Sequence, residues 1–150
     1  MIRLFVYGTL KLGFPLHAAG LTGQRLVGMY RTVVAYPMVV AGPWFTPMML
    51  NEPGRGLRVY GELYEVETNR LVSLDEIEHI GEPGNFREPI DVEPIGGGAC
   101  CAANVYFKAR ELADPIHTTY LGSYQDRRFI PPWSRNQVCP HPGRSRRLFY

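Results

Sequence analysis

Long apolar runs are missing from this 150-residue chain, and their absence argues against a membrane-spanning protein. No stretch approaches the ~18 consecutive apolar residues that a transmembrane helix needs. The first residues, Met1 to Phe5, run directly into the alternating pattern of a strand and do not resemble a signal peptide. We therefore expect a soluble cytoplasmic protein with no membrane partner. A chain of this length buries roughly 70% of its unfolded surface, so we expect residues 1–150 to form a single domain.

Cysteine and histidine are also scarce. The chain has three cysteines, of which Cys100 and Cys101 are adjacent, and four scattered histidines. There is no Cys-x-x-Cys pair and no pair of histidines at helical spacing, so we expect neither a disulfide framework nor a metal site. Adjacent residues of a strand point to opposite faces, and we expect Cys100 and Cys101 to be small buried side chains in a reducing compartment. The pattern assigns no role to Cys139.

Acidic residues are absent from both ends of the chain. All 14 lie between Glu52 and Asp126, which leaves residues 127–150 as a basic tail rich in proline and arginine. Clustered arginines can bind nucleic acid by releasing counterions. The alternative is a solvated segment that docks on its own acidic body, and we favour it because no stacking aromatics are interleaved at regular spacing. The tail arginines are Arg127, Arg128, Arg135, Arg144, Arg146 and Arg147.

Short strands dominate the expected secondary structure. Alternation and turn residues predict strands at residues 2–7, 25–35, 38–41, 48–50, 58–66, 86–92 and 99–107. We expect helices at 16–21, at 68–79 with Thr68 as its cap, and at 116–125. Many short strands with few helices indicate an α+β fold built on a small mixed β-barrel or curled sheet with flanking helices.

One carboxylate in the helix at 68–79 lies on the wrong side for a surface residue. At about 100° per residue, Glu78 projects between Leu71 and Leu74, whereas Glu76 projects to the opposite side. Burial raises the pKa of a carboxylate towards the range of a general base. Two interpretations stay open from the wheel alone: a buried catalytic carboxylate, or a helix-end residue that reaches solvent or pairs with Arg87.

A glycine-containing loop follows the first strand. The segment Tyr7-Gly8-Thr9-Leu10-Lys11 turns sharply at Gly8, and successive N–H groups in such a turn can bind a carboxylate or an oxyanion. Taken alone, the pattern is also that of an ordinary strand end. The glycine spacing excludes a phosphate-binding or dinucleotide-binding loop.

Together, the loop and the helix resemble the gamma-glutamylcyclotransferase-like superfamily, and most closely its gamma-glutamylamine cyclotransferase branch. The resemblance covers roughly residues 1–124. It rests on an ordered series of motifs: Phe5-Val6-Tyr7-Gly8-Thr9-Leu10-Lys11 with Gly13, Pro15 and His17; Tyr36-Pro37-Met38-Val39-Val40-Ala41-Gly42; Pro53-Gly54-Arg55-Gly56; Gly61-Glu62-Leu63-Tyr64; Leu74-Asp75-Glu76-Ile77-Glu78; and Phe86-Arg87.

The resemblance implies an enzyme that cyclises a gamma-glutamyl amine or amino acid to 5-oxoproline and releases the free amine without a cofactor. It implies that Glu78 is the general acid/base and that Tyr7, Gly8, Thr9 and Leu10 bind the substrate. Further substrate-binding candidates are Tyr36, Arg87 and Tyr124, each with a plain structural alternative, and Glu62 ranks behind Glu78 as a carboxylate. In Ser123-Tyr124-Gln125-Asp126, Gln125 interrupts the family's Ser-Tyr-acid element.

A second function class stays open beside the enzyme, namely a non-catalytic small-ligand sensor or interaction module that uses the same pocket. A carboxylate on the apolar side of the helix lowers the stability of the fold, and a purely structural protein has no reason to retain it. Its presence therefore favours the enzyme. The expected partner is a small gamma-glutamyl substrate, a homodimer stays open, and nucleic acid is not expected.

Overall fold

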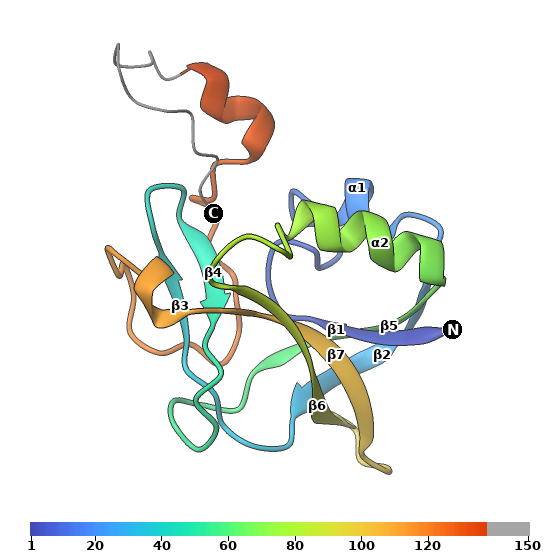
Figure 1. The fold of residues 1–150 in the computed structure, drawn as a ribbon. Helices are drawn as coiled ribbons and strands as arrows, with labels where there is room; N and C mark the ends of the chain where they lie inside the picture. Colours follow the sequence, from blue (N-terminus) through green and yellow to red (C-terminus); the bar gives the residue numbers. More distant parts are fainter. Residues whose placement is uncertain (138–150) are drawn as a thin grey trace.

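A computed structural model describes residues 1–137, and its main body is a closed five-stranded barrel in the order β1-β5-β2-β6-β7 (Figure 1). Neighbouring strands are antiparallel except for β1 and β7, which run parallel. The predicted α+β fold with a small mixed barrel is confirmed. The strands are β1 (Ile2–Val6), β2 (Arg25–Thr32), β5 (Tyr60–Val66), β6 (Asn85–Pro94) and β7 (Cys101–Lys108).

Strand β1 lies between β5 and β7, and its last three residues are buried. It pairs with β5 from Ile2↔Val66 to Val6↔Glu62 and meets β7 at Leu4↔Asn104. The pairing leaves no room beside Gly61, where a Cβ would lie 2.3 Å from the Val6 carbonyl oxygen. Because β1 is held on both edges, the residues that follow Val6 leave the barrel at a defined point.

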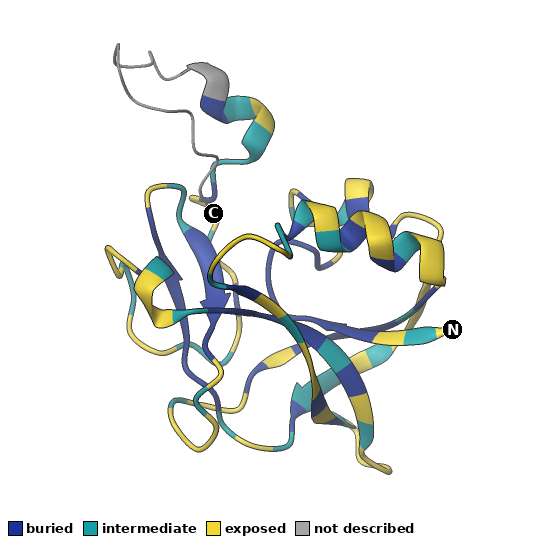
Figure 2. Ribbon diagram, viewed as in Figure 1, coloured by how far each residue is buried: buried dark blue, intermediate teal, exposed yellow. Residues whose placement is uncertain are grey.

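A second, two-stranded sheet packs beside the barrel. It consists of β3 (Met38–Ala41) and β4 (Thr46–Met49), and every residue of both strands is buried (Figure 2). The helix predicted at 116–125 is wrong, because this segment runs in an extended form along β3. The amides of His117 and Leu121 donate to the carbonyls of Val40 and Met38. Its β-branched residues are poor helix formers and suit an extended segment better.

Helices α1 (His17–Leu21) and α2 (Thr68–Ile77) lie together against one side of the barrel (Figure 1). They bury Leu21, Leu71 and Leu74 between them and the strands. Gly20 permits this close approach, since a Cβ there would lie 2.6 Å from Leu10 and 2.9 Å from Leu74. The predicted cap was misplaced by one residue: Glu67 is the N-cap of α2 and Thr68 is the first helical residue.

Helix α2 also ends earlier than predicted. Glu78 is its C-cap, and the Glu78 amide donates to the Leu74 carbonyl at 2.9 Å. His79 follows in the left-handed region with φ 56°, which turns the chain away from the helix axis. The backbone therefore leaves the helix immediately after placing Glu78.

The prediction of two buried cysteines is wrong for Cys100, which is exposed, and for Cys101, which is half-buried. Cys101 is the first residue of β7 and Cys100 precedes the strand, close to the glycine turn at 96–98, where the hairpin of β6 and β7 extends away from the barrel core (Figure 1).

The described part of the basic tail contacts the body just after the loop that follows β1, while docking on the acidic side chains of the body stays a prediction. Arg127 donates to the Gly13 carbonyl at 2.8 Å and stacks on Phe14, and Arg128 pairs with Asp126 at 2.7 Å. The tail continues through a 3-10 helix at Pro132–Gln137. A shorter 3-10 helix, Arg110–Leu112, follows β7 and precedes the tail. Cys139, Arg144, Arg146 and Arg147 lie outside the described residues.

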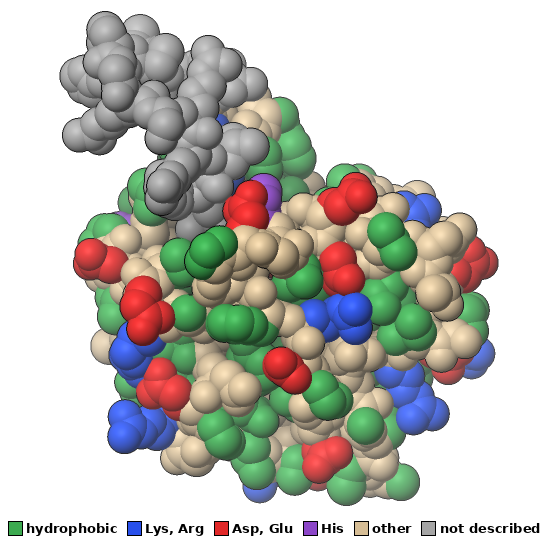
Figure 3. All heavy atoms as spheres, in the orientation of Figure 1, with side chains coloured by type: hydrophobic (Ala, Val, Ile, Leu, Met, Phe, Trp, Pro, Cys, Tyr) green, Lys and Arg blue, Asp and Glu red, His purple; other side chains and the backbone are tan. Residues whose placement is uncertain are grey.

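Charges of both signs are interspersed with hydrophobic side chains on the face shown in Figure 3, over the part formed by described residues. Within residues 1–137, no helix is long and apolar enough to cross a membrane. The same range contains no group of three or more His, Cys, Asp or Glu side chains that could hold a metal ion.

Candidate active site

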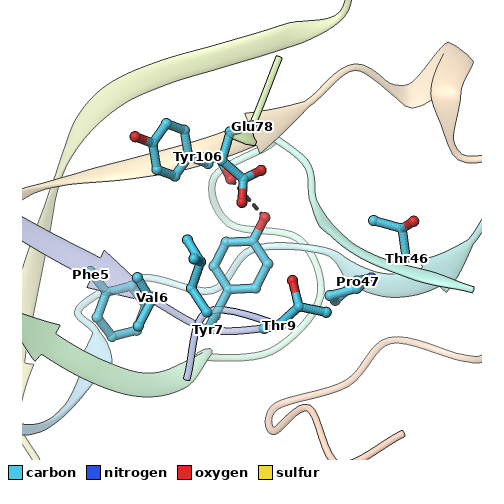
Figure 4. A pocket seen from close by; sticks show the side chains of 10 residues that line it. Phe5, Val6, Tyr7, Thr9, Thr46, Pro47, Glu78 and Tyr106 are labelled. Atoms are coloured by element: carbon cyan, nitrogen blue, oxygen red, sulfur yellow. Dashed lines mark hydrogen bonds between the residues drawn. The ribbon is translucent and has the colours of Figure 1, made fainter. Parts of the chain in front are cut away.

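A pocket lies where β1 ends (Figure 4). The strand and its loop form one wall, β4 forms another, and the end of α2 closes it with β7. The pocket brings together five residues predicted from the sequence: Tyr7, Gly8, Thr9, Leu10 and Glu78. Its other lining residues, which sequence reasoning did not assign to the site, are Phe5, Val6, Thr46, Pro47 and Tyr106.

The loop after β1 is a tight turn with free amides. The Lys11 amide donates to the Gly8 carbonyl at 3.0 Å, and the Leu16 amide donates to the Thr9 carbonyl at 2.9 Å. The amides of Gly8, Thr9 and Leu10 donate in none of the turn and loop hydrogen bonds found within residues 1–137. Gly8 cannot carry a side chain, because a Cβ would lie 2.6 Å from Pro47 Cγ. Such a run of amides is suited to bind an anion.

The loop is held from behind by buried polar groups. Glu62 Oε1 accepts from the Leu12 amide at 2.9 Å and from the Tyr64 hydroxyl at 3.0 Å. Lys11 Nζ donates to the Tyr124 carbonyl at 2.8 Å, and burial lowers the pKa of Lys11. Glu62, the second-ranked carboxylate, therefore supports the loop and does not line the pocket.

Tyr7 connects three elements through its hydroxyl. The hydroxyl donates to the Tyr106 carbonyl at 2.7 Å and accepts from the Met49 amide at 3.2 Å, while the residue is 6% exposed. Burial, and to a lesser extent the charge of Glu78, raises the pKa of Tyr7 above its usual value. Tyr7 therefore remains protonated and serves as a hydrogen-bonding link among β1, β4 and β7.

Glu78 projects into the pocket near the Tyr7 hydroxyl (Figure 4) and is 7% exposed. This is the buried position that the helical wheel predicts. Its cationic partner is Lys108, whose Nζ lies 3.3 Å from Glu78 Oε2. Sequence reasoning missed Lys108, because it lies 30 residues further along the chain at the end of β7.

Arg87 does not pair with Glu78 and does not line the pocket, so the sequence-based pairing is wrong. Its guanidinium makes two hydrogen bonds to Asp75, at 2.9 and 3.1 Å. The Tyr106 hydroxyl donates to the same carboxylate at 2.8 Å, and burial, followed by the hydrogen bond to Asp75, raises the pKa of Tyr106. Arg87 and Asp75 thus hold the side chain of Tyr106, one wall of the pocket, from outside.

Tyr36 and Tyr124 are also outside the pocket lining. Tyr36 packs in the core with its ring 5.5 Å from that of Phe107. Tyr124 is 0% exposed, its ring lies 5.2 Å from Phe14, and its hydroxyl has no hydrogen-bond partner among the described residues. Both side chains belong to the barrel core, and their contact with substrate stays a prediction.

Comparisons with known proteins agree on one family. The profile described as "Gamma-glutamyl cyclotransferase, AIG2-like" matches residues 4–126. The bovine gamma-glutamylaminecyclotransferase is 39% identical over 126 residues, which are 81% of this chain and 74% of the bovine protein. A putative gamma-glutamylcyclotransferase from Arabidopsis thaliana is 42% identical over 58% of this chain and 49% of its own length. The crystal structure of an AIG2-like mouse protein superposes with a TM-score of 0.78 at 32% identity, covering 90% of this chain and 99% of that one.

Proposed function

The chain belongs to the gamma-glutamyl cyclotransferase, AIG2-like family, and on this premise we propose that it cyclises gamma-glutamyl amines to 5-oxoproline and releases the free amine. One observation carries the proposal: Glu78, with its buried carboxylate, lines the same pocket as Gly8, Thr9 and Leu10, whose amides donate in none of the turn and loop hydrogen bonds found within residues 1–137. The pocket thus offers a group that moves protons and a group that binds negative charge.

Glu78 is the general acid/base in this proposal because the other ionisable side chains of the pocket are unsuited to the task. Tyr7 and Tyr106 line it as well, but the pKa of each is raised and each hydroxyl already donates to a protein acceptor. A group that must accept a proton near neutral pH needs an ionised form there. Among the described lining residues, that leaves Glu78.

The proton count of the reaction suits one carboxylate that acts more than once. The α-ammonium of the substrate loses a proton to become a nucleophile, and its nitrogen then attacks the γ-carbonyl carbon. The ring nitrogen loses a second proton, and the leaving amine departs as an ammonium with two additional protons. Glu78 can accept each proton at the α-nitrogen and deliver it to the leaving nitrogen, so that it ends the cycle ionised as it began.

The loop amides have two possible anionic ligands along this path. The amides of Gly8, Thr9 and Leu10 can bind the α-carboxylate, or they can stabilise the oxyanion formed on the γ-carbonyl. A donor directed at such an oxyanion contributes about 3 kcal/mol to transition-state stabilisation. Because β1 is held on both edges and Pro47 packs against Gly8, these amides are preorganised.

Positioning supplies a further part of the rate. The extended glutamyl chain must fold so that its α-nitrogen reaches the γ-carbon, and a narrow pocket walled by Phe5, Val6 and Pro47 favours compact conformations. Intramolecular reactions in the right geometry reach effective molarities on the order of 10⁵ M or more.

Product analysis tests the proposal. The purified chain is incubated separately with gamma-glutamyl-ε-lysine, gamma-glutamyl-alanine and glutathione, and 5-oxoproline is quantified by mass spectrometry. We expect 5-oxoproline and free amine in equal amounts from at least one gamma-glutamyl compound. Absence of 5-oxoproline from all of them contradicts the proposal, and thermal stabilisation by 5-oxoproline without turnover would favour a ligand sensor instead.

A further inference from the structure

We propose that Lys108 is the positioning residue of Glu78: its ammonium holds the carboxylate in the pocket and compensates its negative charge. The inference rests on the proposed function, since it concerns how the acid/base is made ready. Nothing in the sequence pattern of α2 indicates such a partner, because Lys108 comes from the far side of the β6–β7 hairpin.

Lys108 contacts Glu78 at two points and β6 at a third. Its Nζ lies 3.3 Å from Glu78 Oε2 and 3.3 Å from the Glu78 carbonyl oxygen, and it donates to Asn85 Oδ1 at 2.7 Å. Asn85 opens β6 and pairs across the hairpin with Lys108, which closes β7. The ammonium therefore joins the backbone end of α2, the carboxylate and the barrel, and it fixes where the side chain of Glu78 can lie.

The position of Glu78 explains why a cation is needed there. A helix C-terminus carries partial negative charge, so an ionised carboxylate at the C-cap is unfavourable, and burial adds the loss of hydration. Lys108, which is 3% exposed, contacts both the carbonyl and the carboxylate of Glu78. Its positive charge therefore offsets both the unfavourable helix-end charge and the lost hydration. Without it, the negative charge of Glu78 would be left uncompensated at the helix end, and the carboxylate would not be held where it can accept a proton from substrate.

The other titratable groups that face Glu78 do not supply this charge. Tyr7 on β1 and Tyr106 on β7 are neutral phenols with raised pKa values. His79, which follows Glu78, has its pKa lowered mainly by burial; the charges of Lys108 and Arg135 also lower it, while those of Glu82 and Glu78 oppose the shift. His79 is therefore mostly uncharged at neutral pH, whereas Lys108 is in direct contact with the carboxylate.

The choice of lysine is also informative, because Lys11 and Lys108 are the only lysines in the sequence and arginine serves at every other basic position. Both lysines are buried: Lys108 contacts Glu78, and Lys11 follows Leu10 in the loop that lines the pocket. A compact ammonium on a flexible stem can reach a carboxylate and a backbone carbonyl in a confined space, where the planar guanidinium of arginine would not fit in the same way.

The pH dependence of kcat/KM for release of 5-oxoproline, measured from pH 5 to pH 9, tests the role of Lys108. For Lys108→Met we expect kcat/KM at pH 7 to fall by about 10- to 100-fold. The acid-side limb of the profile should move to higher pH by about one unit. Lys108→Arg keeps the positive charge. The acid-side limb of its pH profile should therefore stay near that of the wild type, even though its kcat/KM is lower. Arg31→Met, which breaks the remote 2.8 Å pair with Glu93, is the control and should leave the profile unchanged.

A thermal-melt cycle provides a readout that does not depend on turnover. We expect Lys108→Met to lower Tm more in the wild type than in a Glu78→Gln background, where no buried charge is left unpaired. An unshifted limb in Lys108→Met, or equal Tm losses in the two backgrounds, overturns the proposal. If Lys108→Met does not fold, Lys108→Gln takes its place. If the wild type itself releases no 5-oxoproline, the proposed function fails, while the melts still decide whether Lys108 and Glu78 are coupled.

Discussion

The Tyr7 hydroxyl is the single group whose removal should most directly loosen the pocket. It donates to the Tyr106 carbonyl at 2.7 Å and accepts from the Met49 amide at 3.2 Å, so Tyr7→Phe removes one buried hydrogen bond from each of these backbone groups. A buried hydrogen bond that is lost without replacement costs about 1–3 kcal/mol. We expect the free energy of unfolding to fall by about 3 kcal/mol, which for a chain of this size lowers Tm by roughly 6–12 °C.

The control for this experiment is the same chemical change at a hydroxyl that makes no hydrogen bond. Tyr124 is equally buried, and its hydroxyl has no partner among the described residues. Tyr124→Phe should therefore alter the free energy of unfolding by less than about 0.5 kcal/mol, or raise it slightly. Urea unfolding of both variants measures the difference. Equal losses in the two would refute the reasoning, because the effect would then belong to the loss of any buried hydroxyl.

Three further perturbations test other parts of the account. Gly8→Ala should abolish most of the turnover and lower Tm, because the new Cβ would lie 2.6 Å from Pro47 and must displace the loop; kinetics and melts with wild-type values would contradict this close approach. Arg87→Met should lower the free energy of unfolding by only about 0.5–1 kcal/mol, since its partner Asp75 is partly exposed. The KM for substrate should stay unchanged, and a large rise in KM would indicate that Arg87 contacts the substrate. The free energy of unfolding should fall as the pH rises above about 10, because the buried tyrosines keep their protons in the folded state while the unfolded chain releases them. The fall is up to about 1.4 kcal/mol per pH unit for each tyrosine. Urea unfolding at pH 9 and pH 11 measures this slope, and an equal free energy of unfolding at the two pH values would contradict the prediction. The tyrosines with the largest rise in pKa are Tyr7, Tyr64, Tyr106 and Tyr124.

Local patterns predicted the strands, the two helices and the position of Glu78, because each depends on periodicity within a few residues. The wheel placed Glu78 with Leu71 and Leu74, and the structure buries all three. Contacts across the barrel were not predictable in this way. Tyr106 enters the pocket because β7 lies parallel to β1, and Lys108 reaches Glu78 because the β6–β7 pairing places it beside Asn85.

The errors in the prediction have the same physical origin. Pro47 suggests a break in the chain, yet it lies inside β4, which is tolerated because β4 pairs on one side only, with β3, among the described strands. The segment after Pro115 was predicted to be helical, but its β-branched residues pair along β3 instead. Arg87 is near Glu78 in sequence, but the helix directs Asp75 towards Arg87 and Glu78 towards the pocket.

The measurement that tests the central claim most directly is the rate of 5-oxoproline release by Glu78→Gln compared with Glu76→Gln. Glu76 is the matched control, since it lies two residues away on the same helix and is exposed to solvent. Loss of a general acid/base typically reduces the rate by 10²–10⁴-fold. We predict that kcat falls by about 10²-fold or more in Glu78→Gln while Glu76→Gln retains wild-type kcat. Full activity in Glu78→Gln would contradict the account.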